Sequence, residues 1–244
     1  MAIKVFLASA TGVIGRRLVP PLIDAGYAVF GTTRSESKVA SLKEAGITPV
    51  VLDVYDAPTR STAMKDIRPE IVIHQLTDLP PDLDPSRMDE AIRRNARIRS
   101  EGTRNLVDAA LASGARRLIA QSIAWAYVPG PEPHRENDVL DIHAKGNRAA
   151  TVGGVAALEE LTLSSPPLDG VVLRYGHLYG PGTGADEPGN GVQVHVDAAA
   201  HAALLAIDKG APGIFKVAEP NGEVTIAKAR RELGWDPRFR LEEA

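Results

Sequence analysis

The first twenty residues hold the feature that most restricts the fold of this chain. Residues 5–8 form a continuous apolar run, residues 9–12 are mostly small, and a helical pattern begins at Val13. A buried strand that runs through a tight turn into a helix leaves backbone N–H groups unpaired at the positive end of the helix dipole, which suits a phosphate or pyrophosphate. The residues expected to hold such a ligand are Ser9, Thr11, Gly12, Val13, Ile14 and Gly15.

Two glycines shape this loop. Gly12 and Gly15 lie where the backbone must turn sharply or approach a ligand or the strand closely. Ser9 stands where a loop of this kind normally has its first glycine. A pair of glycines alone is a weak signal, so the rest of the chain decides its meaning.

Strands and helices alternate after this loop. Strands are expected at 5–8, 27–31, 48–52, 70–76 and 117–121, with helices from 13, 36–45, 57–66 and 86–113, and a proline-rich loop at 77–85. Apolar runs without polar alternation indicate strands covered on both faces, as in a parallel sheet. Alternation through short loops predicts a doubly wound α/β fold.

The later part of the chain is less regular. We expect an irregular stretch from 129 to about 146, a helix at 149–163, a strand at 171–174 and a glycine-rich loop at 176–191. Asp197 is expected to cap a helix that runs to 209, and a strand follows at 213–217. Residues 1–244 therefore form one domain, with a small, abbreviated C-terminal substrate lobe built from segments at about 176–196 and 210–244.

Composition narrows the classes of partner. The net charge of −3 gives no sign of a nucleic-acid or membrane partner. The chain has no cysteine, which excludes disulfides and Cys-ligated zinc and fits a reducing, cytoplasmic compartment. His195 and Asp197 have a spacing that a metal pair could use, but no further cluster supports a metal site.

The motifs resemble those of the extended or atypical short-chain dehydrogenases/reductases, the NAD(P)-dependent epimerase/dehydratase family. They stand in the family's order at 10–15, 53–56, 102–110, 173–182, 195–197 and 229–235, and cover nearly the whole chain. The resemblance implies a Rossmann-type doubly wound parallel sheet, a nicotinamide cofactor, a small-molecule substrate and a possible homodimer. It places Asp53, Val54, Leu76, Tyr175 and His177 in contact with the cofactor.

The residue after the second strand bears on the choice of cofactor. A carboxylate usually stands there in folds that prefer NAD, because it accepts a hydrogen bond from the ribose 2′-OH. This chain has Arg34 instead, and a guanidinium suits the 2′-phosphate of NADP, with help from Arg16. The alternatives are that Arg34 only begins a helix near solvent and that Asp53 is a turn residue. NADP is thus expected, with NAD the second choice.

The catalytic residues of the family are where this chain departs from it. The usual reaction needs a Tyr with a Lys four residues later, because a nearby ammonium lowers the pKa of the phenol. No tyrosine here has a lysine at that spacing, and alignment on Glu159 puts Thr151 and Val155 in those places. Ser122 and Tyr127 are the catalytic residues that remain to be considered.

Each of these residues also has a structural interpretation. Ser122 could bind substrate or close the end of the strand, and Tyr127 could supply a phenol or pack in the core. His177 could bind the carboxamide or ribose of the cofactor, or lie on the surface. His143 and Lys145 are replacement acid/base groups or solvated loop residues.

Two functions follow from the sequence. The first is an NADP(H)-binding oxidoreductase that acts on a small carbonyl or hydroxyl substrate with non-standard acid/base residues, the proton coming from water or from the substrate. The alternative is a catalytically degenerate NADPH-sensing or regulatory protein. The trimmed substrate lobe argues against nucleotide-sugar substrates.

Overall fold

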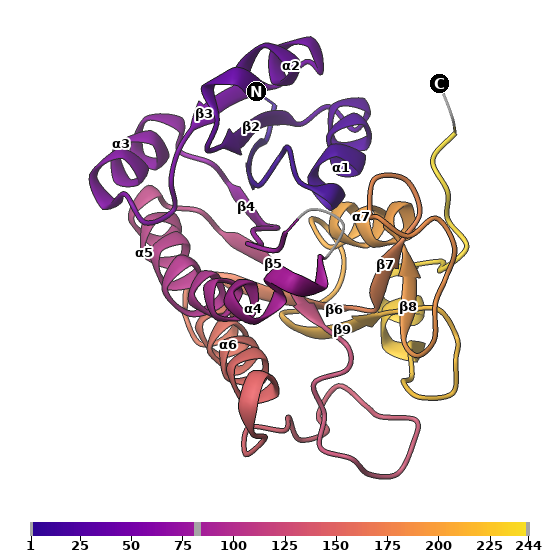
Figure 1. The fold of residues 1–244 in the computed structure, drawn as a ribbon. Coiled ribbons are helices and arrows are strands. Elements are labelled where there is room, and N and C mark those ends of the chain that lie inside the picture. The colour runs from indigo at the N-terminus through magenta and orange to yellow at the C-terminus, as the bar shows by residue number, and fades with distance from the viewer. Residues whose placement is uncertain (1, 81–83, 243–244) are drawn as a thin grey trace.

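A seven-stranded sheet forms the centre of the protein (Figure 1). The structure is a computed structural model that describes residues 2–80 and 84–242, so 81–83 of the expected loop at 77–85 lie outside the described residues. The strand order is β3-β2-β1-β4-β5-β6-β9, and every neighbouring pair is parallel. The strands are β1 (Lys4–Ala8), β2 (Ala28–Thr33), β3 (Thr48–Val51), β4 (Ile71–His74), β5 (Arg117–Ile123), β6 (Asp169–Tyr175) and β9 (Gly213–Val217).

Helices cover both faces of this sheet. The helices are α1 (Val13–Asp24), α2 (Val39–Glu44), α3 (Ala57–Ile67), α4 (Met88–Arg97), α5 (Thr103–Ser113), α6 (Gly146–Leu163) and α7 (Val196–Leu205). Helix α1 packs against α7 on one face, and α3, α4, α5 and α6 pack together on the other (Figure 1). The predicted doubly wound parallel sheet is confirmed, and the chain crosses over between β1 and β4, where such folds bind ligands.

A second, small sheet lies beside the carboxyl edge of the main one. It pairs β7 (His177–Tyr179) with β8 (Gln193–His195) in parallel. The expectation of a loop from 176 to 191 was therefore wrong over its first residues. The strand of the 210–244 segment, β9, pairs with β6 and belongs to the main sheet.

The start of α7 differs from the sequence prediction. His195 is the N-cap, and its Nδ1 accepts a hydrogen bond from the backbone N–H of Asp197. The prediction that Asp197 caps this helix was wrong, because its buried carboxylate pairs with Arg17 of α1 and also accepts from the N–H of Leu241. Asp197 thus ties the first helix and the C-terminal segment to α7.

The helix expected over 86–113 is divided in the structure. A 3₁₀ turn (Pro85–Arg87) precedes α4, and a π-helical turn (Ile98–Gly102) separates α4 from α5. A Cβ atom at Gly102 would lie 3.4 Å from the side chain of Val54, so this turn packs closely on the segment after β3. Within the described ranges, no helix has the length and apolarity that crossing a membrane requires.

Candidate functional site

The loop between β1 and α1 is folded for close approach by a ligand. Ser9 has φ of +75°, the left-handed conformation for which glycine is favoured, and its N–H donates to Thr32 Oγ1. The N–H of Gly12 donates to the Ser9 carbonyl. Ser9 therefore makes the turn that the missing first glycine normally makes, at the cost of local backbone strain.

The backbone leaves no room for a side chain at Gly15, whereas a side chain at Gly12 would require the Ser9 hydroxyl to turn away. A Cβ atom at Gly15 would lie 2.1 Å from the Ser9 carbonyl oxygen, and one at Gly12 would lie 2.5 Å from Ser9 Oγ. The first-turn N–H groups of Val13 and Ile14 have no partner within α1, because every helix leaves its first donors free. Free N–H groups at the start of a helix are the arrangement that binds phosphate groups in general.

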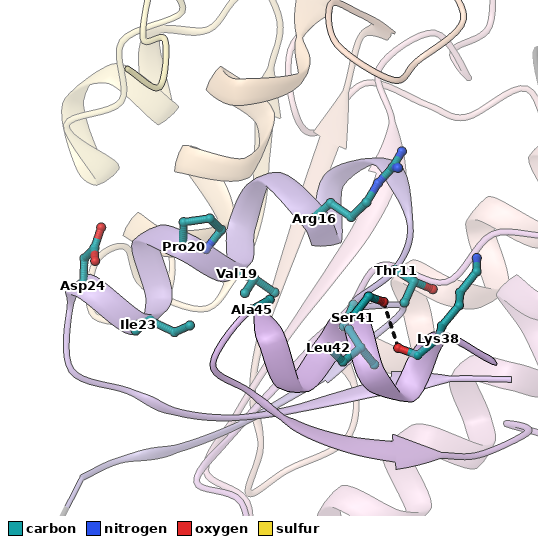
Figure 2. A pocket seen from close by; sticks show the side chains of 11 residues that line it. Thr11, Arg16, Val19, Pro20, Ile23, Asp24, Lys38, Ser41, Leu42 and Ala45 are labelled. Atoms are coloured by element: carbon teal, nitrogen blue, oxygen red, sulfur yellow. Dashed lines mark hydrogen bonds between the residues drawn. The ribbon is translucent and has the colours of Figure 1, made fainter. Parts of the chain in front are cut away.

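A pocket of about 660 Å³ lies between α1 and α2. Figure 2 shows Arg16, Thr11 and Lys38 at one end of it, and Ile23 and Asp24 at the other. Arg16 and Lys38 are exposed. Two cations therefore stand beside the phosphate-binding loop, and the sequence analysis considered only Arg16. The signal for Lys38 was its place four residues after Arg34, in the first turn of the helix expected at 36–45.

Arg34 lies on the side of the loop where β2 ends. Its guanidinium is 60% exposed and 3.7 Å from the carboxylate of Asp78, which also pairs with Arg94 at 3.4 Å. Asp78 follows β4, so the pair connects the ends of two strands that lie on opposite sides of β1. The Arg34 side chain therefore lies at the carboxyl end of β2 and is mostly exposed to solvent.

The other cofactor residues expected from the sequence follow β3 and β4. Asp53 is exposed and accepts a hydrogen bond from the N–H of Tyr55, as a turn residue does. Val54 is buried, and its carbonyl accepts from Asn105. Leu76 is partly buried, and its N–H donates to His74. All three therefore lie beyond the carboxyl ends of β3 and β4, the strands on either side of the β2–β1 pair.

The two residues expected to be catalytic lie in a buried polar network. Ser122 is 3% exposed, and its hydroxyl donates to the carboxylate of Glu159 on α6 at 2.7 Å. That carboxylate also binds the guanidinium of Arg174 in bidentate fashion, at 2.8 and 2.6 Å. Arg174 in turn donates to the Tyr127 hydroxyl at 2.8 Å. The network joins β5, β6, α6 and the segment after β5.

The environment of Tyr127 opposes proton transfer at neutral pH. The ring is 4% exposed, and burial raises the pKa of Tyr127 to about 12, against the opposing effect of Arg174. The phenol is therefore protonated and accepts from a cation. Its role in this arrangement is to anchor the segment after β5.

Replacing Tyr127 with Phe tests the catalytic role that the sequence suggested. We expect kcat to stay within about threefold of wild type, and the free energy of unfolding to fall by about 1 kcal/mol because one hydrogen bond is lost. Steady-state NADPH oxidation and urea unfolding measure the two effects. A fall in kcat of about 100-fold or more in a folded variant would instead identify a general acid/base.

Lys216 extends this network along the sheet. It is the register partner of Arg174, which is itself the partner of Ser122, so three polar side chains lie side by side on β5, β6 and β9. Lys216 is fully buried, with its ammonium bonded to the His134 carbonyl and 4.9 Å from the centre of the Tyr127 ring. The signal in the sequence was a single lysine within an apolar strand, which the sequence analysis did not single out.

Titration of Lys216 is expected to make stability rise with pH. Burial lowers the pKa of Lys216 from 10.5 to about 8, so between these values the unfolded chain binds more protons than the folded one. The free energy of unfolding of wild type, minus that of Lys216→Met, should therefore increase by up to about 3 kcal/mol from pH 8 to 10.5. Urea unfolding at several pH values measures it, and a difference that does not change with pH contradicts the prediction.

The positions that the sequence analysis aligned with the family's acid/base pair hold Thr151 and Val155. Val155 is fully buried and belongs to a cluster with Ile123, Ala126 and Val152, against which Trp125 packs. Thr151 is half-buried on the same helix, α6. The cluster therefore has no ammonium at Val155 to lower the pKa of a neighbouring group.

Two residues from the sequence analysis follow β6 or end it. Tyr175 is 3% exposed, its hydroxyl lies 3.4 Å from the Gln75 amide nitrogen, and burial raises its pKa. His177 is exposed on one side and stacks on Trp125, with ring centres 3.7 Å apart. Trp125 was missed, because its position in an irregular segment gave no motif signal.

Some known proteins are similar to this chain in sequence, and others are similar to it in fold. Residues 9–207 match the model of a family described as NAD(P)H-binding. A 3-diazoavenalumate denitrifying reductase from Streptomyces sp. is 42% identical over an alignment of 237 residues that covers 88% of this chain and 76% of that protein.

Two crystal structures of UDP-glucose 4-epimerase are similar to this chain in fold. The enzyme from Thermotoga maritima, with UDP-glucose, has a TM-score of 0.77 at 21% identity and covers 98% of this chain and 94% of its own. The enzyme from Thermus thermophilus, with NAD, has a TM-score of 0.74 at 20% identity, covering 98% and 95%.

Proposed function

This chain belongs to the NAD(P)H-binding family of the short-chain dehydrogenase/reductase superfamily, and from that membership we propose that it is an NADP(H)-dependent reductase of a small electrophilic molecule. The observation that carries the proposal is the loop after β1. Ser9 is already in the left-handed conformation, and Gly15 lies too close to its carbonyl oxygen for any side chain. Such a loop is preorganised for a pyrophosphate and needs no rearrangement to bind it.

The cations around this loop support NADP in preference to NAD. Arg34, Arg16 and Lys38 are exposed near its edge, where the adenosine ribose lies in folds of this type. A 2′-phosphate would give Arg16 and Lys38 an anionic partner and would offer the exposed Arg34 guanidinium a second one besides Asp78, whereas the 2′-hydroxyl of NAD carries no charge. Hydrogen bonds to a charged group contribute about 1.5–3 kcal/mol.

Arg34→Ala is expected to weaken NADPH binding by about 10- to 100-fold and to change NADH binding by less than about twofold, because only NADPH carries the 2′-phosphate. Calorimetric titration of both nucleotides measures this. Arg104→Ala, an exposed arginine at the start of α5 on the other face of the sheet, is the control and should bind both as wild type does. Equal losses for the two nucleotides would show that Arg34 does not recognise the phosphate.

The residues around the expected nicotinamide end favour a substrate that needs no enzyme acid. Reduction of a carbonyl produces an alkoxide that must be protonated, and the segment offers aliphatic Ile123 and Val155 with the hydroxyl of Thr151. A diazonium cation avoids this need, because hydride transfer to its carbon breaks the carbon–nitrogen bond and N₂ leaves with no charge left to be protonated. The Streptomyces relative is named for the denitrifying reduction of a diazo compound.

We therefore place this chain among reductases of small diazo compounds. When bound, NADPH would supply the hydride: a diazonium R–N₂⁺ and NADPH give R–H, N₂ and NADP⁺. The transferred hydrogen ends on the carbon whose bond to nitrogen breaks, so atoms and charge balance. The contribution of the protein is to hold the two reactants in contact and to exclude water from the apolar side of the site.

The proposed function is tested with purified protein, NADPH and a panel of diazo and carbonyl compounds. We expect NADPH oxidation and an equal amount of N₂ with at least one diazo compound. Turnover of a carbonyl compound alone would support the substrate class that the sequence suggested. NADPH binding without turnover of any compound would favour a regulatory binding protein.

A further inference from the structure

Trp125 and His177 form an aromatic pair at the carboxyl edge of the sheet. The last residues of β5 and β6, Ile123 and Tyr175, are register partners, and each aromatic residue lies two positions beyond its strand. The two rings are stacked, with centres 3.7 Å apart and planes at 18°. This edge is where open α/β sheets bind ligands, and β5 and β6 lie on its nicotinamide side.

The pair is fixed on one side and open on the other. Trp125 packs against the buried cluster of Ile123, Ala126, Val152 and Val155, which holds the indole in place. His177 is exposed, and partial burial of its ring lowers its pKa, so the imidazole is uncharged at neutral pH. Among the described residues, none makes a hydrogen bond to the indole of Trp125 or to the imidazole of His177.

We propose that the Trp125–His177 pair is a platform on which a planar aromatic ring of the substrate stacks. This rests on the proposed function and names its substrate class: an aromatic diazo compound in preference to an aliphatic one. Two aromatic rings prefer offset-stacked or edge-to-face contact. Such contact adds affinity beyond the contribution of the apolar area that the rings bury. An uncharged platform also accepts a cationic diazonium without charge repulsion.

The first test compares two acids that the enzyme cannot reduce by loss of N₂. Calorimetry with NADP⁺-saturated protein measures the affinity of 4-hydroxycinnamate, which is planar, and of 3-cyclohexylpropionate, which is not. We expect wild type to bind the planar acid at least about fivefold more tightly, and His177→Ala and Trp125→Leu to bind the two acids equally. Retention of the preference in both variants overturns the proposal.

The second test uses turnover with an aryl diazonium salt and with ethyl diazoacetate, whose reduction to ethyl acetate and N₂ also takes up one proton from water. In His177→Ala we expect kcat/KM to fall about tenfold for the aryl compound and less than about twofold for the aliphatic one. Trp125→Phe should keep the preference, and Arg104→Ala, whose side chain is exposed on α5, is the control. Equal losses for the two compounds, or a loss of NADPH affinity, overturn the proposal, since the latter would mean that the pair holds the nicotinamide.

The two tests separate failure of this inference from failure of the proposed function. If neither diazo compound turns over, the proposed function fails, and the preference for 4-hydroxycinnamate still decides whether the platform exists. If both diazo compounds turn over equally well and 4-hydroxycinnamate binds no more tightly than 3-cyclohexylpropionate, the proposed reductase function is supported. The proposal that the aromatic pair is a platform is then wrong.

Discussion

Gly15→Ala is expected to reduce NADPH affinity by about 100-fold or more, because the added methyl group cannot be placed without moving the loop. Its Cβ would lie 2.1 Å from the Ser9 carbonyl oxygen and 2.9 Å from the backbone of Ala10, and neither is the end of a flexible side chain. The backbone of the loop must shift, and the N–H groups that face the pyrophosphate shift with it. A loss of about 2.7 kcal/mol in binding corresponds to about 100-fold.

The measurement is calorimetric titration of the variant with NADPH, together with its melting temperature. The same clash is expected to lower the free energy of unfolding by about 1–3 kcal/mol, as overpacking does, so the protein should still fold. Gly153→Ala is the matched control: Gly153 is exposed within α6, no heavy atom lies within 4 Å of its Cβ position, and alanine favours a helix. Unchanged NADPH affinity in a folded Gly15→Ala would contradict the assignment of this loop to the cofactor.

Glu159→Gln is expected to lower the free energy of unfolding by about 3–5 kcal/mol, the largest effect on stability among the changes proposed for this protein. Glu159 and Arg174 are 5% and 2% exposed and are bonded to each other twice. Removal of the carboxylate charge leaves a guanidinium in the interior with no counter-charge, and Ser122 loses part of its acceptor. The effect arises from desolvation of the remaining charge.

Urea unfolding at pH 7 measures this change. Glu101→Gln is the control, because its pair with Arg97 has the same chemistry on an exposed helix surface, where such pairs contribute about 0.5 kcal/mol or less. The double variant Glu159→Leu/Arg174→Met should regain part of the lost stability, since the Arg174 guanidinium is then removed as well, while buried Arg99 still loses its attraction to Glu159. A loss below about 1 kcal/mol in Glu159→Gln would mean that water reaches this network.

Of the two features behind these predictions, the loop at Gly15 could be recognised from the sequence, and the Glu159–Arg174 pair could not. Gly15 could be singled out from the sequence because a strand, a small-residue turn and a helix follow each other directly at the start of the chain. The pair of Glu159 and Arg174 could not be derived in the same way, since the partners come from a helix and a strand and meet only when α6 packs on the sheet. Ser122 and Tyr127 were selected as reactive groups by their place in and after β5, and only their partners show how they are held.

The same contrast applies to the residues that were missed. Lys216 reads as one polar residue in an apolar strand, and its register with Arg174 is set by the pairing of β6 with β9, which are distant in sequence. Trp125 belongs to no motif, and it pairs with His177 because β5 and β6 end side by side. Such contacts depend on strand order, which local patterns do not encode.

Local periodicity and the backbone freedom of a few residues were enough to predict a parallel sheet, the succession of the first strands and helices along the chain, and the loop with Ser9, Gly12 and Gly15. Which side chains meet at the carboxyl edge became clear only from the packing of the folded chain. It placed Ser122 and Tyr127 in a buried polar network, brought Lys38 beside Arg16, and stacked His177 on Trp125. The physical reason is that burial and charge pairing are properties of neighbours in space, and those neighbours come from segments distant in the chain.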